Sequence, residues 1–279
     1  MQFNKAQIII ILVLLSLVGI LYYLNHKSSE VELTATSAVH RPEQKPFDFE
    51  SFRASLNDSL SPEGLALVNQ LEAEAKSSNQ GVFALAALSQ AWDSLGFRLV
   101  SAHYLEQIAN KVNDENSWFS AGTKYYEFSA VTPDTGMQMF STSKAIQAFE
   151  KVIALNENNL EAKNSLAICY VQNDVDIMKG VQILKDITRR DSTNIQANYT
   201  LGMLSMRSGQ MDKAVQRFET LTRLQPLNAD FYYFLGQCYV ALENKSQAIK
   251  AFETFQKLVP DEEAKQSIES TILNLKNSK

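Results

Sequence analysis

Residues 199–226 read YTLGMLSMRSGQMDKAVQRFETLTRLQP, and residues 233–260, 34 positions later, read YFLGQCYVALENKSQAIKAFETFQKLVP. A leucine-glycine pair, an alanine, a phenylalanine and a proline recur in the same places. These matching pairs are Leu201 and Leu235, Gly202 and Gly236, Ala214 and Ala248, Phe218 and Phe252, and Pro226 and Pro260. A unit of this size with two helical apolar patterns cannot bury its own core, so copies must stack on one another. The period therefore predicts an array of helix pairs whose function lies in a surface.

The same pattern extends towards the N-terminus with local defects. One extra residue falls in the turn around 173–179. An insertion of 11 residues, TPDTGMQMFST (132–142), separates the two helical patterns of an earlier unit. We predict about five units within 82–260. Their ranges are 82–114, 115–158, 160–193, 195–228 and 229–260.

The recurring residues have physical roles in such a unit. Gly202 and Gly236 are small where two helices cross closely, whereas Phe218 and Phe252 fill the space between them. Pro226 and Pro260 end the second helices of the last two units. In these residues the chain resembles the tetratricopeptide repeat (TPR) family, most clearly over 160–260. The resemblance implies an all-α fold, a right-handed α-solenoid of helix hairpins, and it suggests the membrane-anchored bacterial type.

A second decisive feature lies near the N-terminus. Ile8–Leu24 is a run of 17 residues without a charge. As a helix it would be about 26 Å long, close to the thickness of a bilayer core. We therefore predict a short tail at 1–6 and a transmembrane helix at 7–24. A cleaved signal peptide and a buried helix are the alternatives, but residues 22–26 offer no small-x-small cleavage site.

The positive charges on the two sides of this run are nearly balanced. Lys5 and the amino terminus lie before it, and His26 and Lys27 follow it. The short N-terminal tail favours export of residues 25–279. We expect a single-pass inner-membrane protein with these residues in the periplasm.

The remaining segments outside the repeats have distinct patterns. Residues 25–46 are polar, contain two prolines and lack a helical period, which predicts a flexible linker. Residues 47–81 begin with closely spaced phenylalanines and continue as a helix. We expect these aromatic side chains to dock on the first helices, with a partner-binding motif as the alternative. Residues 261–279 carry one apolar stripe, which predicts a helix that caps the last repeat.

Composition and motifs exclude several classes of function. The net charge is −5 and no stripe of Lys and Arg appears, so nucleic acid is not an expected partner. The sequence contains no HExxH, CxxC, GxSxG or glycine-rich phosphate loop. We therefore expect no enzyme, no cofactor and no metal site. Cys169 and Cys238 are expected to be buried and unpaired, and His103 is expected to be a packing or surface residue.

The surface that the resemblance points to is the concave groove lined by the first helix of each unit. Its candidate residues follow a spacing of i, i+4, i+7 beside the packed face. They are Phe119, Tyr126, Asn164, Ile168, Tyr199, Met203, Met206, Tyr233 and Gln237. Aromatic and methionine side chains suit an apolar peptide segment or a partner helix. The alternative is that they fill a tight superhelix or are covered by residues 47–60.

These observations favour a membrane-anchored scaffold that binds other proteins or peptides in this groove. One alternative is an assembly chaperone for exported proteins, similar to the tetratricopeptide factors of cytochrome c maturation. Another is an accessory subunit of an envelope enzyme, or an unrecognised enzyme. The sequence leaves the oligomeric state and the identity of the partner open.

Overall fold

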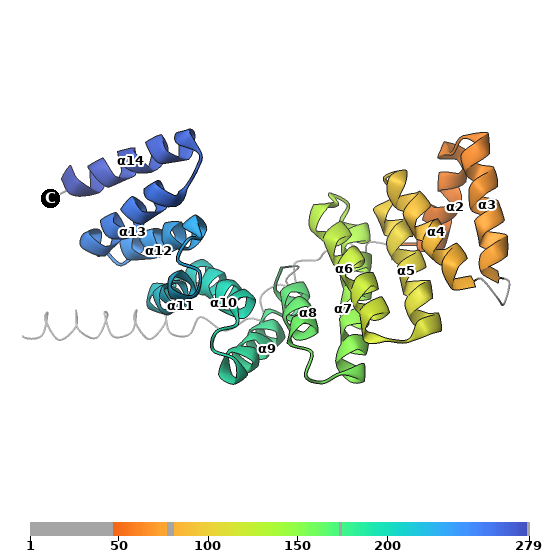
Figure 1. Ribbon diagram of the computed structural model, residues 1–279, viewed down its shortest axis with the longest axis horizontal. Helices are drawn as coiled ribbons and strands as arrows, with labels where there is room; N and C mark the ends of the chain where they lie inside the picture. The colour runs from red at the N-terminus through yellow and green to blue at the C-terminus, as the bar shows by residue number, and fades with distance from the viewer. Residues whose placement is uncertain (1–46, 77–80, 173–174, 278–279) are drawn as a thin grey trace, which may run out of the picture. The chain divides into compact units, whose positions relative to one another are not determined.

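The structure is a computed structural model that describes residues 47–76, 81–172 and 175–277. The predicted tail, anchor and linker, at 1–6, 7–24 and 25–46, lie outside these residues. The described residues form thirteen α-helices and one short 3-10 helix, and they contain no strand (Figure 1). The prediction of an all-α fold is confirmed.

The described helices follow one another along the chain. They are α2 (Phe49–Ser55), the 3-10 helix η1 (Leu56–Ser59), α3 (Pro62–Lys76), α4 (Gly81–Ser94), α5 (Arg98–Val112), α6 (Glu115–Val131), α7 (Thr135–Leu155), α8 (Leu160–Gln172), α9 (Ile177–Arg190), α10 (Ile195–Arg207), α11 (Met211–Leu224), α12 (Ala229–Ala241), α13 (Lys245–Leu258) and α14 (Glu262–Asn277).

Helices α4 to α13 form five antiparallel hairpins in the part of the chain that the structure describes. The hairpins are α4 with α5, α6 with α7, α8 with α9, α10 with α11, and α12 with α13, and each packs on the next. First helices of successive hairpins also meet, because α8 contacts both α6 and α10. Such nearest-neighbour packing is typical of a repeat array, in which each unit buries the face of the one before it.

Polar side chains begin several helices at the expected positions. Asp114, Asp134 and Asn194 each accept a hydrogen bond from the backbone N–H three residues later, over 2.7–2.9 Å. These bonds satisfy N–H groups that have no partner within the helix.

The turn inside a hairpin uses the left-handed backbone region, where Gly209 has φ 73° and Glu243, 34 positions later, has φ 58°.

Close helix crossings hold the hairpins together. In α6, α10 and α12 a glycine faces the phenylalanine ring of the following helix. A methyl group added at Gly122, Gly202 or Gly236 would lie 2.9, 3.1 or 2.4 Å from the nearest ring carbon. The phenylalanines concerned, Phe149, Phe218 and Phe252, are almost fully buried. The predicted role of Gly202 and Gly236 is confirmed.

In the other two hairpins, different small residues lie where the two helices cross. In the α8–α9 hairpin the glycine lies in the second helix, and a methyl group at Gly180 would lie 2.6 Å from Val171. In the α4–α5 hairpin two buried serines meet, with the Ser89 and Ser101 hydroxyl oxygens 3.0 Å apart. A small residue at the crossing is thus common to all five hairpins of the described chain.

The 132–142 insertion lengthens two helices. Helix α6 runs to Val131 and α7 starts at Thr135, so that α6 has 17 residues and α7 has 21. The corresponding helices α10 and α11 have 13 and 14 residues. Phe140, on the added turns of α7, packs against Phe47, Phe49 and Tyr125 at ring-centroid distances of 5.3, 5.7 and 6.4 Å.

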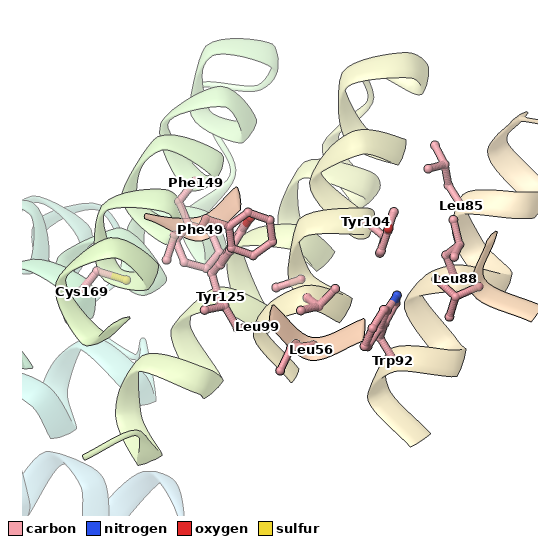
Figure 2. Packing of buried hydrophobic residues seen from close by; sticks show 14 of the residues in the cluster. Phe49, Leu56, Leu85, Leu88, Trp92, Leu99, Tyr104, Tyr125, Phe149 and Cys169 are labelled. Carbon is pink, nitrogen blue, oxygen red and sulfur yellow. The ribbon is translucent and has the colours of Figure 1, made fainter. Parts of the chain in front are cut away.

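The segment before α3 is packed into the hydrophobic core. Phe49 and Leu56 are only 7% and 8% exposed. They share a cluster of buried side chains with Trp92, Leu99 and Tyr125, which extends from α2 to α8 (Figure 2). The aromatic residues of 47–59 are therefore packed against the repeats.

The C-terminal helix closes the last hairpin. Ile268 and Ile272 of α14 are buried against Phe252 and Phe255 of α13. Without α14 these phenylalanines would face water, so the helix has the role of a cap. Both cysteines of the chain, Cys169 and Cys238, are buried and free, as expected.

The glycine crossings can be tested by Gly236→Ala. The new methyl group would clash with the Phe252 ring, and overpacking of this kind costs about 1–3 kcal/mol of unfolding free energy. Gly202→Ala is the matched control, because its closest ring contact is 3.1 Å and alanine gains about 1 kcal/mol in helix propensity. Urea unfolding followed by circular dichroism should give the lower stability for Gly236→Ala. Equal stability of the two variants would contradict the crossing as described.

Candidate functional site

Four of the nine candidate groove residues come together at one cavity. It has a volume of about 330 Å³ and lies on α6, α8 and α10. Tyr126 comes from α6, Ile168 from α8, and Tyr199 and Met203 from α10. The other lining residues are Val171, Gln172, Gln196, Thr200, Leu204 and Arg207.

Only first helices of hairpins line this cavity. Its walls form because α8 contacts α6 on one side and α10 on the other. No residue of 47–60 is part of the lining. The cavity therefore lies on helices that the sequence assigned to the groove, and residues 47–60 do not contribute to its lining.

The floor of the cavity is apolar, and its rim is polar and largely uncharged. Ile168, Met203 and Leu204 are half-buried, and Val171 is buried. At the α6 side, the Tyr126 hydroxyl donates a 2.6 Å hydrogen bond to Gln172 Oε1 and so fixes the tyrosine ring between two helices. Burial raises the pKa of Tyr126, which therefore stays neutral and keeps this donor at physiological pH.

Two rim residues on α10 have free hydrogen-bonding groups. In the described chain, the side chains of Gln196 and Thr200 form no hydrogen bond with other residues. They lie four positions apart and thus on the same side of the helix. An amide and a hydroxyl are available there beside an apolar floor.

The other five candidate residues lie outside the cavity lining. They are Phe119, Asn164, Met206, Tyr233 and Gln237. Phe119 packs on Phe149 with ring centroids 5.5 Å apart, and Met206 packs on the cluster around Phe218. Gln237 is half-buried.

Asn164 and Tyr233 are held by neighbouring residues. Asn164 is 6% exposed and donates a 3.2 Å hydrogen bond to Asn194, while its own side-chain oxygen has no partner. The Tyr233 ring lies 5.3 Å from that of Phe255 and 6.2 Å from that of Phe252. These contacts place both side chains in the packing between elements.

The sequence reasoning missed part of the lining on α10. Gln196, Thr200 and Arg207 follow a second stripe, rotated around the helix from the one through Tyr199 and Met206. The two stripes share Met203. The spacing i, i+4, i+7, i+11 from Gln196 is the signal that could have located it.

Other kinds of site are not found in the described residues. Within 47–76, 81–172 and 175–277, no group of three His, Cys, Asp or Glu side chains could hold a metal ion. None of the described helices combines the length and the apolar character needed to cross a membrane. The segment predicted to be the anchor lies outside them.

The family comparison identifies the last two helix pairs, α10 with α11 and α12 with α13. The TPR_16 family model, described as tetratricopeptide repeat, matches residues 199–263. Residues 199–263 contain tetratricopeptide repeats. A search of curated proteins finds no match.

Solved structures share the fold of these repeats. A tetratricopeptide repeat protein from Parabacteroides merdae ATCC 43184 is similar with a TM-score of 0.53 and 13% identity, over 81% of this chain and 84% of the other. A double mutant of MamA from strain RS-1 has a TM-score of 0.52 and 16% identity, over 70% of this chain and 99% of the other. At these identities the likeness concerns the fold alone.

Substitution of Tyr233 tests whether its side chain contributes to the packing of the helices. We expect Tyr233→Ala to lower the free energy of unfolding by about 1–3 kcal/mol, because it removes an aromatic ring from a packed cluster. Gln237→Ala, one turn later on the same helix, should change it by less than about 0.5 kcal/mol. Chemical unfolding of both variants provides the measurement. If Tyr233→Ala leaves the free energy of unfolding unchanged, the ring does not contribute to packing. Tyr233 would then remain a candidate for lining the groove.

Proposed function

We propose that the chain is a membrane-anchored scaffold that binds an extended apolar segment of a partner protein at the cavity on α6, α8 and α10. The observation that carries this proposal is the convergence of Tyr126, Ile168, Tyr199 and Met203 on one hollow of about 330 Å³. Clefts with an apolar floor and a few polar groups at the rim are typical of binding sites.

The chemistry of the rim favours an extended segment as the occupant. The backbone N–H and C=O groups of a bound helix are already paired within the helix, whereas those of an extended peptide are free. The Gln196 amide and the Thr200 hydroxyl could pair with such groups, while Ile168 and Met203 accept an apolar side chain.

The charges of the lining residues further restrict which peptide segment can bind. Among the described residues that line the cavity, none is acidic and Arg207 is the one basic residue. A positively charged segment would find no carboxylate there, so an uncharged segment fits better.

The anchor is the second part of the proposal. It rests on the uncharged run Ile8–Leu24, which is long enough for a bilayer core. With residues 25–279 in the periplasm, the linker at 25–46 would let the repeats meet partners near the inner membrane. Confinement to a surface raises the effective concentration of the binding site.

The binding site is tested by Thr200→Arg. A long charged side chain at the rim should fill the cavity mouth and weaken partner binding at least about tenfold, which corresponds to about 1.4 kcal/mol. The partner is first identified by affinity capture and mass spectrometry, and its affinity for the full-length chain is then measured with purified components.

Thr222→Arg is the matched control, because it makes the same change at a half-buried threonine of α11. It should leave the affinity within about twofold of that of the unchanged chain. Equal binding by Thr200→Arg and the unchanged chain would reject this site. Binding only to unfolded precursors, and not to a fixed folded partner, would favour the chaperone alternative.

Deletion of residues 7–24 tests the anchor. The full-length chain should sediment with membranes and resist extraction by high salt, whereas the deletion variant should remain in the supernatant. Protease added to intact spheroplasts should degrade the repeats of the full-length chain if they are periplasmic. If the repeats are fully protected from the protease, they lie on the cytoplasmic side of the membrane. A full-length chain that stays in the supernatant would refute the anchor.

A further inference from the structure

A second cavity is formed by α7, α8 and α9. It has a volume of about 200 Å³. Both of its outer helices, α7 and α9, are second helices of hairpins, whereas only first helices line the α6–α8–α10 cavity. The two cavities share helix α8 but no lining residue.

The two cavities use different faces of α8. Leu166 lines the α7–α8–α9 cavity, and Ile168, two residues later, lines the other. Residues two positions apart on a helix are turned about 200° from each other. The α7–α8–α9 cavity is therefore built on another side of α8 than the predicted groove.

The uncharged part of the lining is entirely aliphatic. Leu166 and Ile187 are 5% and 1% exposed, and Ile153, Leu160 and Ile183 are half-buried. Such side chains offer no hydrogen bond to water, and an apolar cavity of about 150 Å³ in another protein binds benzene. This cavity therefore has room for one leucine or phenylalanine side chain of a partner.

The size of the cavity indicates what kind of partner it fits. Pockets that enclose a whole drug-sized molecule measure about 300–1,000 Å³, and this cavity, at about 200 Å³, is smaller. The size favours a single side chain of a larger partner over a small molecule or a long acyl chain that is enclosed whole.

Three charged residues complete the lining. They are Lys163 of α8 and Asp186 and Arg190 of α9. Asp186 is already engaged, with the Arg189 guanidinium at 2.8 Å and the Gln182 amide at 3.1 Å. Within 47–76, 81–172 and 175–277, the side chains of Lys163 and Arg190 form no ion pair and no hydrogen bond. The lining thus presents two unpaired cations beside an apolar hollow.

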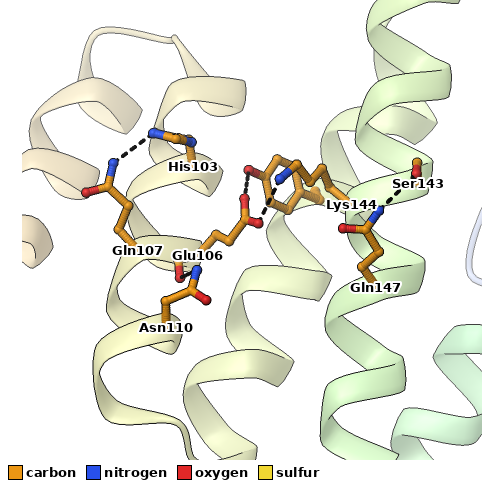
Figure 3. Close-up of polar contacts among 8 residues, drawn as sticks. His103, Glu106, Gln107, Asn110, Ser143, Lys144 and Gln147 are labelled. Carbon is orange, nitrogen blue, oxygen red and sulfur yellow. Dashed lines mark hydrogen bonds and ion pairs between the residues drawn. The ribbon is translucent and has the colours of Figure 1, made fainter. Parts of the chain in front are cut away.

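Cations at the neighbouring joins between hairpins are paired. The Lys144 ammonium of α7 lies 2.8 Å from the Glu106 carboxylate of α5 (Figure 3). Lys179, near the start of α9, lies 3.7 Å from Glu150 of α7. Each of these carboxylates also accepts a hydrogen bond from a tyrosine of the intervening first helix. The two cations at the cavity have no such carboxylate in the described chain, and a partner would supply it.

Helix stability does not account for Lys163. A cation is stabilising at the C-terminus of a helix, and an anion is stabilising at the N-terminus. Arg190 is the last residue of α9, so the helix dipole explains part of its position. Lys163 is the fourth residue of α8, near the end where a cation is disfavoured. Its charge is therefore available for a contact outside the helix.

We propose that the α7–α8–α9 cavity is a second docking site, which binds a peptide segment with one large apolar side chain between acidic residues. The apolar side chain enters the cavity, and the flanking carboxylates pair with Lys163 and Arg190. This goes beyond the proposed function, because it adds a second site with other residues and another charge preference. With both cavities occupied, one chain would hold two partners together.

Methyl NMR of the full-length chain with labelled isoleucines tests the site. The probe is an acetylated and amidated peptide of sequence GDLDG, in which a leucine lies between two aspartates. In a titration to millimolar peptide, the methyl signals of Ile153, Ile183 and Ile187 should shift in a saturable manner. The signal of Ile168, in the other cavity, should stay in place.

Two altered peptides separate the charge contribution from the apolar contribution. GNLNG has no carboxylates and should bind at least about twofold more weakly, because two exposed ion pairs are lost. GDSDG lacks the leucine side chain and should bind at least about tenfold more weakly. Added salt should weaken the binding of GDLDG and not that of GNLNG.

Substitutions in the chain assign the contacts. Lys163→Gln and Arg190→Gln should each weaken GDLDG binding about two- to fivefold and leave GNLNG binding unchanged. Lys250→Gln, at an exposed lysine of α13, is the matched control and should change neither. Leu160→Trp should fill the cavity and abolish the saturable shifts, whereas Leu227→Trp, at a leucine that is 82% exposed, should keep them.

Four results would overturn the second site. One is the absence of a saturable shift at Ile153, Ile183 and Ile187. Another is equal binding of GDLDG and GNLNG, because the carboxylates would then contribute nothing. The third is a shift of the same three signals when the chain is diluted without peptide, which would assign the cavity to a second copy of the chain. The fourth is tighter binding of decanoate than of GDLDG, which would assign it to a lipid carboxylate.

Discussion

The rest of the structure depends on the contact between a glycine in one helix and a phenylalanine ring in the next. It occurs at Gly122, Gly202 and Gly236, where an added methyl group would lie 2.9, 3.1 and 2.4 Å from the nearest ring carbon. Because the ring occupies the space of the absent side chain, the two helices of a hairpin approach closely and in one orientation. Serines or a glycine of the second helix achieve the same closeness in the other hairpins.

This constraint decides which side chains remain to line the cavity. The packed face of each first helix is turned towards its partner helix, so a second face is left to line the space shared by α6, α8 and α10. Tyr126, Ile168 and Met203 meet there although more than 30 residues separate each from the next in sequence. The side chains that line the cavity are held on packed helices, so their positions are set by the core.

The sequence predicted the recurring features and the docking of the N-terminal aromatic residues, but not the particular side chains that they contact. The crossing glycines and phenylalanines follow from the 34-residue period, and the capping helix follows from its single apolar stripe. Tyr233 and Phe119 lie on the stripe predicted to line the groove, but they are long side chains that reach neighbouring aromatic rings. No period marks the pairing of Phe49 with Phe140, since it joins a segment outside the repeats to an insertion within them.

The central claim is that a partner segment lies on the first helices at α8 and α10. Photo-crosslinking in intact cells tests it most directly, with a photoreactive residue at Ile168, at Met203 or at Met178, which is 75% exposed on the second helix α9. The account predicts that one partner segment is joined to both Ile168 and Met203 and not to Met178. Crosslinks from Met178 alone, or none from the two cavity positions, would contradict it.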